Sequence, residues 1–399
     1  MTFSHFLSAM NTVRNLIPVS LILSLLTLSC MTTPKKDDYQ LHKFTLEGFI
    51  PYEEGYEKGT SGGYGGALGD FLILGAGCNF PDKPNADGGK KKYYGAFYAV
   101  KGGEAKLFAR MPSPRGYGAS VVNKEGDKLF LVGGTDDSVL YPAIFEVRLE
   151  DGEPVMERIE HALPFGWAEG GAALRGHMLY LAGGWEAKGK PLTEVLSFDL
   201  LTGKSERLAS LPGGEGRIQP GVFVKNGKLY LYGGNNPSDG SRPSALHDKS
   251  FALDLETREW REVRQPETPT GEGLLPFVGT AVTKAPGTGE IYAAGGVNRE
   301  VFNAAVLREY NQSKASEEEL PRYAELRREY LTQEPAWYRF SPALWRFNAE
   351  TETWEVLLSD PAFATAGALL AGDTEGRLYL AGGERKPGIR TPDLFEIRK

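Results

Sequence analysis

The chain alternates short hydrophobic runs with glycine-rich turns, and the same arrangement of runs recurs six times. Each recurrence holds an apolar run that closes on two glycines, then a polar loop, then a second run rich in aromatic residues. The six apolar runs lie at 71–77, 129–134, 179–184, 229–234, 291–296 and 378–383, the first with a degenerate Gly-Ala-Gly ending. Continuous apolar runs of this length that end in glycine indicate strands buried on both faces.

The aromatic runs and the ends of the chain predict how the repeats are arranged. The aromatic runs lie at 93–100, 144–149, 195–200, 250–255, 344–348 and 393–397, and a further strand follows in five repeats. Repeats of four short strands over about 40 to 50 residues are typical of β-propellers. The sixth repeat stops without a fourth strand, whereas residues 41–51 form an orphan run. We therefore predict an all-β, six-bladed propeller whose last blade is completed by the N-terminal strand, which closes the ring.

One repeat, the fifth, carries a long insertion at 302–342 between its second and third strands. Within it, Ser316 and Glu319 have the spacing of a helix capping box, ahead of a charged helical run at 317–331. Long loops in compact domains are often functional lids, so we expect a helix-bearing cap.

The N-terminus has the pattern of an export signal. An apolar run at 16–28 follows Arg14 and ends at Ser29-Cys30, a length that suits a signal peptide better than a membrane span. The ending LTLSC resembles a bacterial lipobox, although Thr27 stands where that pattern prefers Leu. We expect a signal peptide at 1–29, lipidation of Cys30, a tether at 30–40 and the propeller at 41–399. The location would be the periplasm or cell surface, anchored by lipid to the outer membrane, with simple secretion as the alternative.

Charge and ligand-type residues narrow the function classes. The formal net charge is −7, and no basic stripe suits a nucleic-acid partner. The histidines show no metal-ligand spacing, so we expect neither a metal site nor a metal cofactor; they are His5, His42, His161, His177 and His247. Cys78 is the only cysteine besides Cys30, which excludes an intrachain disulfide once Cys30 is lipidated.

Candidate ligand-binding residues follow from the topology of a blade. The end of the second strand and the start of the first lie on one face, so the loops at both places converge on the central channel. After the glycine pairs these loops carry Asn79, Thr135, Asp136, Trp185, Glu186, Asn235, Asn236, Asn298 and Glu384, and the blade entries add Arg115 and Arg217. Such a polar ring suits a polyhydroxylated ligand, and the alternative is a set of solvated turn residues. As substrate-binding candidates we take Arg115, Arg217, Asn298, Asn235 and Asn79.

The loop after the sixth glycine pair has the strongest signal for chemistry. The run GERKPGIRT at 383–391 places the carboxylate of Glu384 and three cations in one turn shaped by Pro387 and Gly388. A carboxylate beside the channel can act as a general base, and the guanidinium of Arg390 can hold a carboxylate by two hydrogen bonds. We take Glu384 and Arg390 as the catalytic candidates.

The repeats resemble the kelch family, and this loop resembles the signature of bacterial N-acetylneuraminate epimerases, the sialic acid mutarotases. Further similar stretches are GGVNREVFN at 295–303, the helical insertion behind it, ATAGA at 364–368 and RGYG at 115–118. The stretches occur in rotated order, with the Glu384 blade last, as in the cyclically permuted branch of that family. A closed ring tolerates this rotation because every contact between blades is kept.

The resemblance implies interconversion of the α and β anomers of N-acetylneuraminate without a redox cofactor or metal. Glu384 would take the proton of the anomeric hydroxyl, and Arg390 would clamp the carboxylate or stabilise oxyanion charge, with Arg115 or Arg217 as further clamps. Two alternatives stay open. One is an exported propeller that binds glycans or a protein without turnover, and the other is a mutarotase or isomerase for another sugar.

Overall fold

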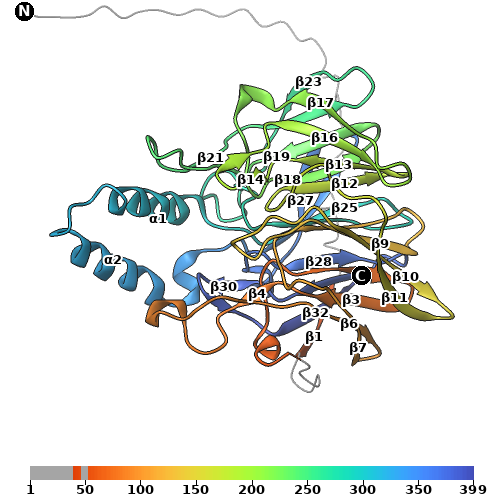
Figure 1. The fold of residues 1–399 in the computed structure, drawn as a ribbon, viewed down its shortest axis with the longest axis horizontal. Helices are drawn as coiled ribbons and strands as arrows, with labels where there is room; N and C mark the ends of the chain where they lie inside the picture. The colour runs from red at the N-terminus through yellow and green to blue at the C-terminus, as the bar shows by residue number, and fades with distance from the viewer. Residues whose placement is uncertain (1–38, 46–52) are drawn as a thin grey trace, which may run out of the picture. The chain divides into compact units, whose positions relative to one another are not determined.

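Six four-stranded antiparallel sheets, called blades 1 to 6, make up the fold in a computed structural model that describes residues 39–45 and 53–399 (Figure 1). Blade 1 consists of β2 (Tyr64–Leu68), β3 (Phe71–Gly75), β6 (Ala96–Lys101) and β7 (Glu104–Arg110). Blade 2 consists of β8 (Ala119–Val122), β9 (Lys128–Val132), β10 (Ile144–Glu150) and β11 (Glu153–Arg158). Blade 3 consists of β12 (Gly171–Arg175), β13 (Met178–Ala182), β16 (Glu194–Asp199) and β17 (Ser205–Ser210).

The other three blades follow the same order. Blade 4 consists of β18 (Gly221–Lys225), β19 (Lys228–Tyr232), β22 (Ser250–Asp254) and β23 (Trp260–Val263). Blade 5 consists of β24 (Ala281–Lys284), β25 (Ile291–Ala294), β26 (Ala343–Asn348) and β27 (Thr353–Ser359). Blade 6 consists of β28 (Leu369–Gly372), β29 (Leu378–Ala381), β32 (Asp393–Arg398) and β1 (Gln40–Thr45). The predicted six-bladed propeller is confirmed.

The N-terminal strand closes the ring, as predicted. β1 pairs antiparallel with β32, in register from Gln40 opposite Arg398 to Thr45 opposite Asp393. Among the first strands, β2 lies between β28 and β8, and β8, β12, β18 and β24 continue the circle back to β28. Blade 6 therefore lies opposite blade 3 in the ring.

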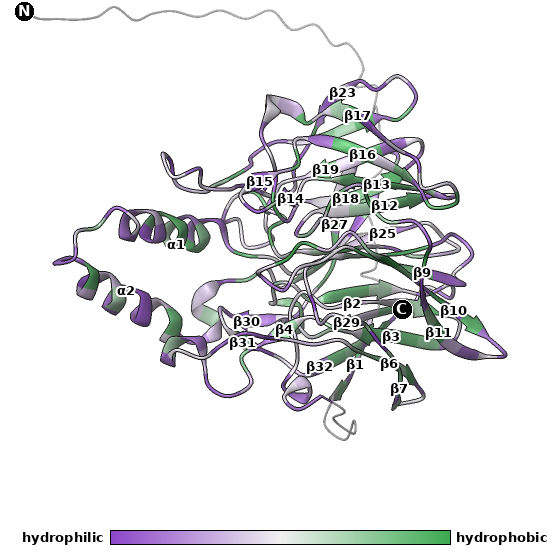
Figure 2. Cartoon of the chain, in the orientation of Figure 1, coloured by the Kyte–Doolittle hydropathy of each residue, from purple (hydrophilic) through white to green (hydrophobic). Residues whose placement is uncertain are grey.

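The core lies between the blades, where apolar strand faces meet. The second strands are almost continuously buried, as their apolar runs predicted, and the strands are mainly hydrophobic while the loops are mainly polar (Figure 2). Between blades 4 and 5, Phe223 stacks on Tyr230 and packs edge-on against Phe347 and Trp354. Aromatic contacts of this kind add to the stabilisation that burial of the rings supplies.

The insertion between β25 and β26 forms two helices, α1 (Arg299–Gln312) and α2 (Leu320–Thr332), which project together from the blades (Figure 1). The first helix begins three residues ahead of the predicted insertion, because the Asn298 side chain caps it by accepting a hydrogen bond from Val301 N at 3.1 Å. The second begins at Leu320 rather than at residue 317. There Ser316 N donates to Glu319 Oε2 at 2.9 Å, and the residues between them form a turn.

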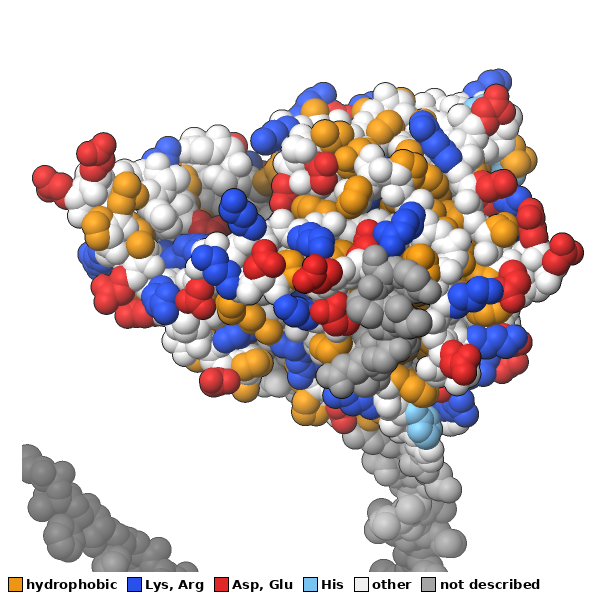
Figure 3. All heavy atoms as spheres, turned by 60° about the horizontal axis from the view of Figure 1, so that its bottom comes forward, with side chains coloured by type: hydrophobic (Ala, Val, Ile, Leu, Met, Phe, Trp, Pro, Cys, Tyr) orange, Lys and Arg blue, Asp and Glu red, His pale blue; other side chains and the backbone are white. Residues whose placement is uncertain are grey.

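Four two-stranded hairpins extend from the ends of the second strands toward the face that carries the insertion. They are β4 (Cys78–Asn79) with β5 (Lys92–Tyr93), β14 (Trp185–Ala187) with β15 (Lys190–Pro191), β20 (Asn235–Asn236) with β21 (Ala245–Leu246), and β30 (Glu384–Lys386) with β31 (Ile389–Arg390). On the face drawn in Figure 3, acidic and basic side chains are interspersed.

The predicted signal peptide, Cys30 and most of the tether lie outside the described residues. Within residues 39–45 and 53–399, no helix is long and apolar enough to cross a membrane.

Candidate active site

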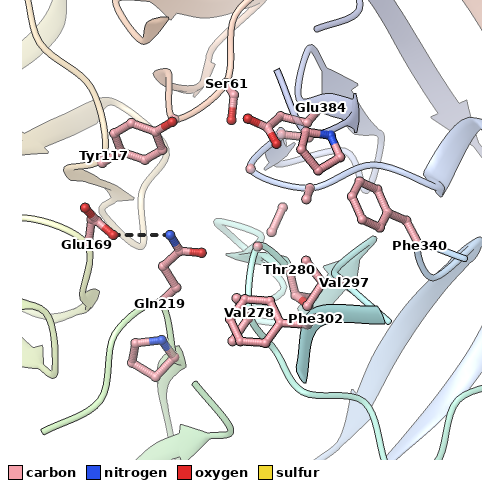
Figure 4. Close-up of a pocket in the computed structure, with 18 of the residues that line it drawn as sticks. Ser61, Tyr117, Glu169, Gln219, Val278, Thr280, Val297, Phe302, Phe340 and Glu384 are labelled. Atoms are coloured by element: carbon pink, nitrogen blue, oxygen red, sulfur yellow. Dashed lines mark hydrogen bonds between the residues drawn. The ribbon is translucent and has the colours of Figure 1, made fainter. Parts of the chain in front are cut away.

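A cavity of about 380 Å³ lies where the loops that enter the six blades meet the central channel. We call it the mouth cavity. A second cavity of about 210 Å³, lined by the first strands of the blades, continues along the channel. The position and the size of the mouth cavity are typical of a small-molecule site. The polar side chains of the mouth cavity, most of them labelled in Figure 4, are Ser61, Tyr117, Glu169, Gln219, Thr280, Asn298 and Glu384.

Each blade is entered through one residue with a left-handed backbone, and these six residues surround the mouth cavity. They join neighbouring blades: Glu169 N donates to Tyr117 O at 2.7 Å, and Gln219 N donates to Glu169 O at 2.7 Å. A residue other than glycine in this conformation costs on the order of 1 kcal/mol. The six are Gly62 (φ 65°), Tyr117 (57°), Glu169 (58°), Gln219 (55°), Gly279 (67°) and Gly367 (66°). Three blades therefore carry a side chain where glycine would be less strained.

Glu384 enters the cavity from blade 6. It is the first residue of β30, directly after the glycine pair that ends the second strand, and it stands opposite Arg390 in the β30–β31 hairpin. Arg390 Nη2 lies 2.6 Å from Glu384 Oε1, and the two side chains are 3% and 22% exposed. The carboxylate faces the cavity (Figure 4), whereas the guanidinium is almost completely covered. The structure thus brings the two predicted catalytic residues into direct contact.

Burial and the ion pair act on Glu384 in opposite directions. Burial raises the pKa of Glu384 above its usual 4.5, and Arg390 and, more weakly, Lys91 lower it, with a net rise. For Arg390, burial lowers the pKa, but Glu384, Tyr117 and Cys78 together outweigh burial and the pKa is raised. The Glu384 carboxylate is therefore more basic than an exposed one, which favours a role as a general base.

The guanidinium is held from behind by residues of blade 1. It lies 5.2 Å from the centre of the Phe80 ring, and Nη2 lies 4.0 Å from Cys78 Sγ. Arg390 Nε and Nη1 are buried without a hydrogen-bond partner in the described part of the chain. Arg390 thus keeps donor capacity beyond its pair with Glu384.

The three side chains at the blade entries, Tyr117, Glu169 and Gln219, line the cavity and were not among the predicted site residues, and neither were Ser61 and Thr280. Gln219 Nε2 donates to Glu169 Oε2 at 3.3 Å. The Tyr117 hydroxyl accepts a hydrogen bond from Cys78 Sγ at 3.3 Å, and burial raises its pKa well above 10.0, so the phenol stays protonated. An alignment of the six blade entries would have found Tyr117, Glu169 and Gln219, because these residues of blades 2, 3 and 4 stand where blades 1, 5 and 6 have glycine.

The helical insertion supplies the apolar side of the cavity. Phe302 of α1, Tyr330 of α2 and Phe340 line it together with Val278 and Val297 of blade 5 (Figure 4). Such a wall excludes water and suits the carbon face of a sugar.

The insertion is also tied to blade 1, on the other side of blade 6 from blade 5. Arg328 Nη1 lies 3.1 Å from Asp87 Oδ1, and Arg327 Nη2 donates to Asn85 Oδ1 at 3.1 Å, both in the loop between β4 and β5. The predicted cap therefore spans from blade 5 to blade 1.

Of the five predicted binding residues, Asn298 is the one that lines the mouth cavity within the described chain, and its amide is engaged by Val301 N and by Glu272 Oε2. The other four do not line the mouth cavity and are engaged by other groups of the protein, although Arg115 Nη1 and Arg217 Nε are buried without a hydrogen-bond partner in the described part of the chain. Asn79 donates to Gly55 O and Gly59 O, and Asn235 donates to Ser244 Oγ. Arg217 donates to Gly233 O and Lys249 O. Arg115 donates to Ser113 O and stacks on Tyr141. Their role in binding stays a prediction.

The fold and the site together define a six-bladed propeller with a carboxylate–guanidinium pair at the mouth of its channel. A family model of N-acetylneuraminate epimerase matches residues 160–398, and the chain belongs to this family. N-acetylneuraminate epimerase of Pasteurella multocida (strain Pm70) is 28% identical over 58% of this chain and 56% of its own length. That of Escherichia coli O139:H28 is 26% identical over 48% of each chain.

The chain thus spans about half the length of the curated relatives it matches. A solved structure, "Structure of YjhT", is similar with a TM-score of 0.56 at 15% identity, over 86% of this chain and 98% of that one. At this identity it supports the propeller fold alone. The rotated order of segments stays a prediction.

Proposed function

We propose that the protein interconverts the α and β anomers of N-acetylneuraminate by acid/base ring opening in the mouth cavity. One observation carries the proposal: the carboxylate of Glu384 faces the cavity with a raised pKa and is fixed by Arg390 at 2.6 Å. Membership of the epimerase family supports the sugar.

In this mechanism Glu384 takes the proton of the anomeric hydroxyl, the bond from C2 to the ring oxygen breaks, and the ring oxygen receives a proton. Rotation about the bond to C2 in the open keto form, followed by reclosure, gives the other anomer. Arg390 holds the Glu384 carboxylate in position. No C–H bond breaks, so the reaction needs only proton transfer.

The test is proton NMR of anomer exchange in freshly released N-acetylneuraminate with sub-stoichiometric protein. Glu384→Gln should lower kcat by about 10²- to 10⁴-fold with little change in KM, because the amide keeps the size of the side chain but accepts no proton. Glu194→Gln is the matched control, since Glu194 is paired with Arg207 on blade 3. Normal exchange by Glu384→Gln would remove Glu384 from the mechanism, and no acceleration by the wild type would favour a binding protein.

A mutarotase for a neutral sugar is the second candidate. Among the described residues that line the mouth cavity there are two carboxylates and no Lys or Arg. An acidic sugar would therefore have to recruit a cation from the rim or from Arg390, whereas a neutral sugar would not. The same NMR experiment with neutral hexoses separates the two substrates.

We also propose that the reaction takes place outside the cytoplasm on a lipid-anchored protein. The apolar run at 16–28 and the LTLSC sequence before residue 31 support this location.

A further inference from the structure

We propose that Glu169 is the general acid of this reaction, which delivers a proton to the ring oxygen as the sugar opens and recovers it on reclosure. The inference rests on the proposed function, in which Glu384 is the base. It adds a second catalytic residue on another blade.

The position of Glu169 is the first reason. Glu169 and Glu384 both line the mouth cavity, one at the entry to blade 3 and the other in blade 6, which are opposite blades of the ring (Figure 4). The anomeric hydroxyl and the ring oxygen are bonded to the same carbon. A sugar whose C2 lies between the two side chains can offer one oxygen to each.

The surroundings of Glu169 are the second reason. Its carboxyl group accepts a hydrogen bond from Gln219 at 3.3 Å, and among the described residues no Lys or Arg lies within ion-pair distance of it. Lys91, whose charge acts on the pKa of Glu169, forms its ion pair with Asp137, at 3.0 Å. Burial raises the pKa of Glu169 above 4.5, the Gln219 hydrogen bond and Lys91 lower it, and Asp137 raises it, with a net rise. The Arg390 guanidinium favours the charged form of Glu384, whereas Glu169 has the neutral Gln219 side chain as its partner, so Glu169 is the better placed of the two to hold a proton.

The backbone of Glu169 is the third reason. Its φ of 58° matches that of Gly62, Gly279 and Gly367 at the same place in other blades. A glutamate held in a conformation that glycine adopts freely indicates that the side chain is needed there. Among the described residues, the Glu169 side chain has one hydrogen bond, from Gln219, whose own φ is 55°. That hydrogen bond does not explain why a glutamate occupies this conformation.

The protons balance through the cycle. Glu384 accepts the hydroxyl proton as the C2 oxygen becomes a ketone oxygen, the electron pair of the broken C–O bond stays on the ring oxygen, and Glu169 protonates it. On reclosure that hydroxyl returns its proton to Glu169 while attacking the other face of C2, and Glu384 returns its proton to the former ketone oxygen. Both residues end as they began.

The experiment compares wild type, Glu169→Gln, Glu384→Gln and the control Glu194→Gln in the anomer-exchange assay across pH. Glu169→Gln should lower kcat by about 10²-fold or more with KM nearly unchanged, because the amide keeps the Gln219 contact but cannot give up a proton. The wild-type profile should rise with pH as Glu384 ionises and fall as Glu169 ionises. Glu169→Gln should lose the falling limb and keep the rising one.

Three outcomes are distinguishable. Wild-type kcat in Glu169→Gln together with loss of activity in Glu384→Gln overturns Glu169 as the acid but keeps the proposed function. An unchanged falling limb in Glu169→Gln also overturns it. If the wild type is inactive, infrared difference spectra of wild type against Glu169→Gln decide instead. They should show a protonated carboxyl group that titrates above 4.5, and its absence overturns the assignment of Glu169 as a proton holder.

Discussion

Replacing Arg390 by Met should destabilise the protein in a way that depends on pH. The substitution keeps an unbranched side chain of similar reach against Phe80 and removes the charge. Glu384 is then left as a buried carboxylate whose nearest cation is gone. Because burial already raises its pKa with Arg390 present, that pKa must rise further without it.

The size of the effect follows from the geometry of the pair. Two unit charges about 4 Å apart at an effective dielectric constant of about 20 attract by about 4 kcal/mol. Removing one partner of a buried pair typically costs about 3–5 kcal/mol, since the other charge is left desolvated. With side chains 3% and 22% exposed, the pair belongs to this regime rather than to surface ion pairs. We expect Arg390→Met to lower the free energy of unfolding by about 3 kcal/mol at pH 7.

The sign of the pH dependence is fixed by the carboxyl group. A group whose pKa is higher in the folded than in the unfolded state binds more protons when folded, so stability falls as pH rises through that window. The deficit of Arg390→Met should therefore be largest at neutral pH and shrink as the pH falls toward 4.5, where Glu384 becomes neutral. Urea denaturation at several pH values measures it.

The double variant Arg390→Met/Glu384→Gln is the internal control. It has no buried charge at this place, so it should recover most of the stability that Arg390→Met loses and show no matching pH dependence. A deficit of Arg390→Met that is equal at pH 7 and pH 4.5, or that the double variant retains in full, would show that the loss comes from packing and refute the electrostatic argument.

Two further predictions concern other parts of the chain. Burial, with help from Arg217, lowers the pKa of His247 from 6.5 to about 4, so the stability that neutral His247 contributes is complete above pH 6.5 and is lost as the pH falls toward 4, by at most about 3 kcal/mol. His247→Gln should therefore make the midpoint of urea denaturation depend less on pH between 6.5 and 4. An unchanged pH dependence in the variant would show that His247 is not its cause. Cys30→Ser should abolish incorporation of radiolabelled fatty acid and release the protein from the membrane fraction, whereas labelling that persists in the variant would place the lipid elsewhere.

The blades could be predicted because their signal is repeated and local. Runs such as 229–234 combine continuous apolar character with a terminal glycine pair, a pattern typical of a strand buried on both faces. The closure by β1 followed from counting strands. The start of α1 was missed because Asn298 follows a glycine pair, as turn residues do in the other blades, and its role as a cap depends on Val301 folding back to it.

The candidate site was predicted only in part, because sequence position does not give side-chain direction. Arg217 and Gln219 lie two residues apart at one blade entry, yet Arg217 turns into its own blade to bind Gly233 O, whereas Gln219 lines the cavity. The left-handed backbone at Gln219 reverses the direction that an extended strand would give. Glu384 was found because its loop has a recognisable sequence, whereas Glu169 belongs to an entry that varies from blade to blade.

The asymmetry of the mouth cavity follows from which blade entries are glycine. The three glycine entries are consecutive in the ring, in blades 5, 6 and 1, and a Cβ there would lie 2.9 Å from Ala366 Cβ at Gly279, 2.4 Å from Ser61 Oγ at Gly367 and 2.6 Å from the Tyr117 ring at Gly62. This is the side from which the insertion and Glu384 approach. The opposite arc, in blades 2 to 4, carries Tyr117, Glu169 and Gln219. A ring of six equivalent positions thus becomes a site with the Glu384 carboxylate and an apolar wall on one side and polar groups on the other, as the proposed proton transfers at two oxygens of one sugar carbon require.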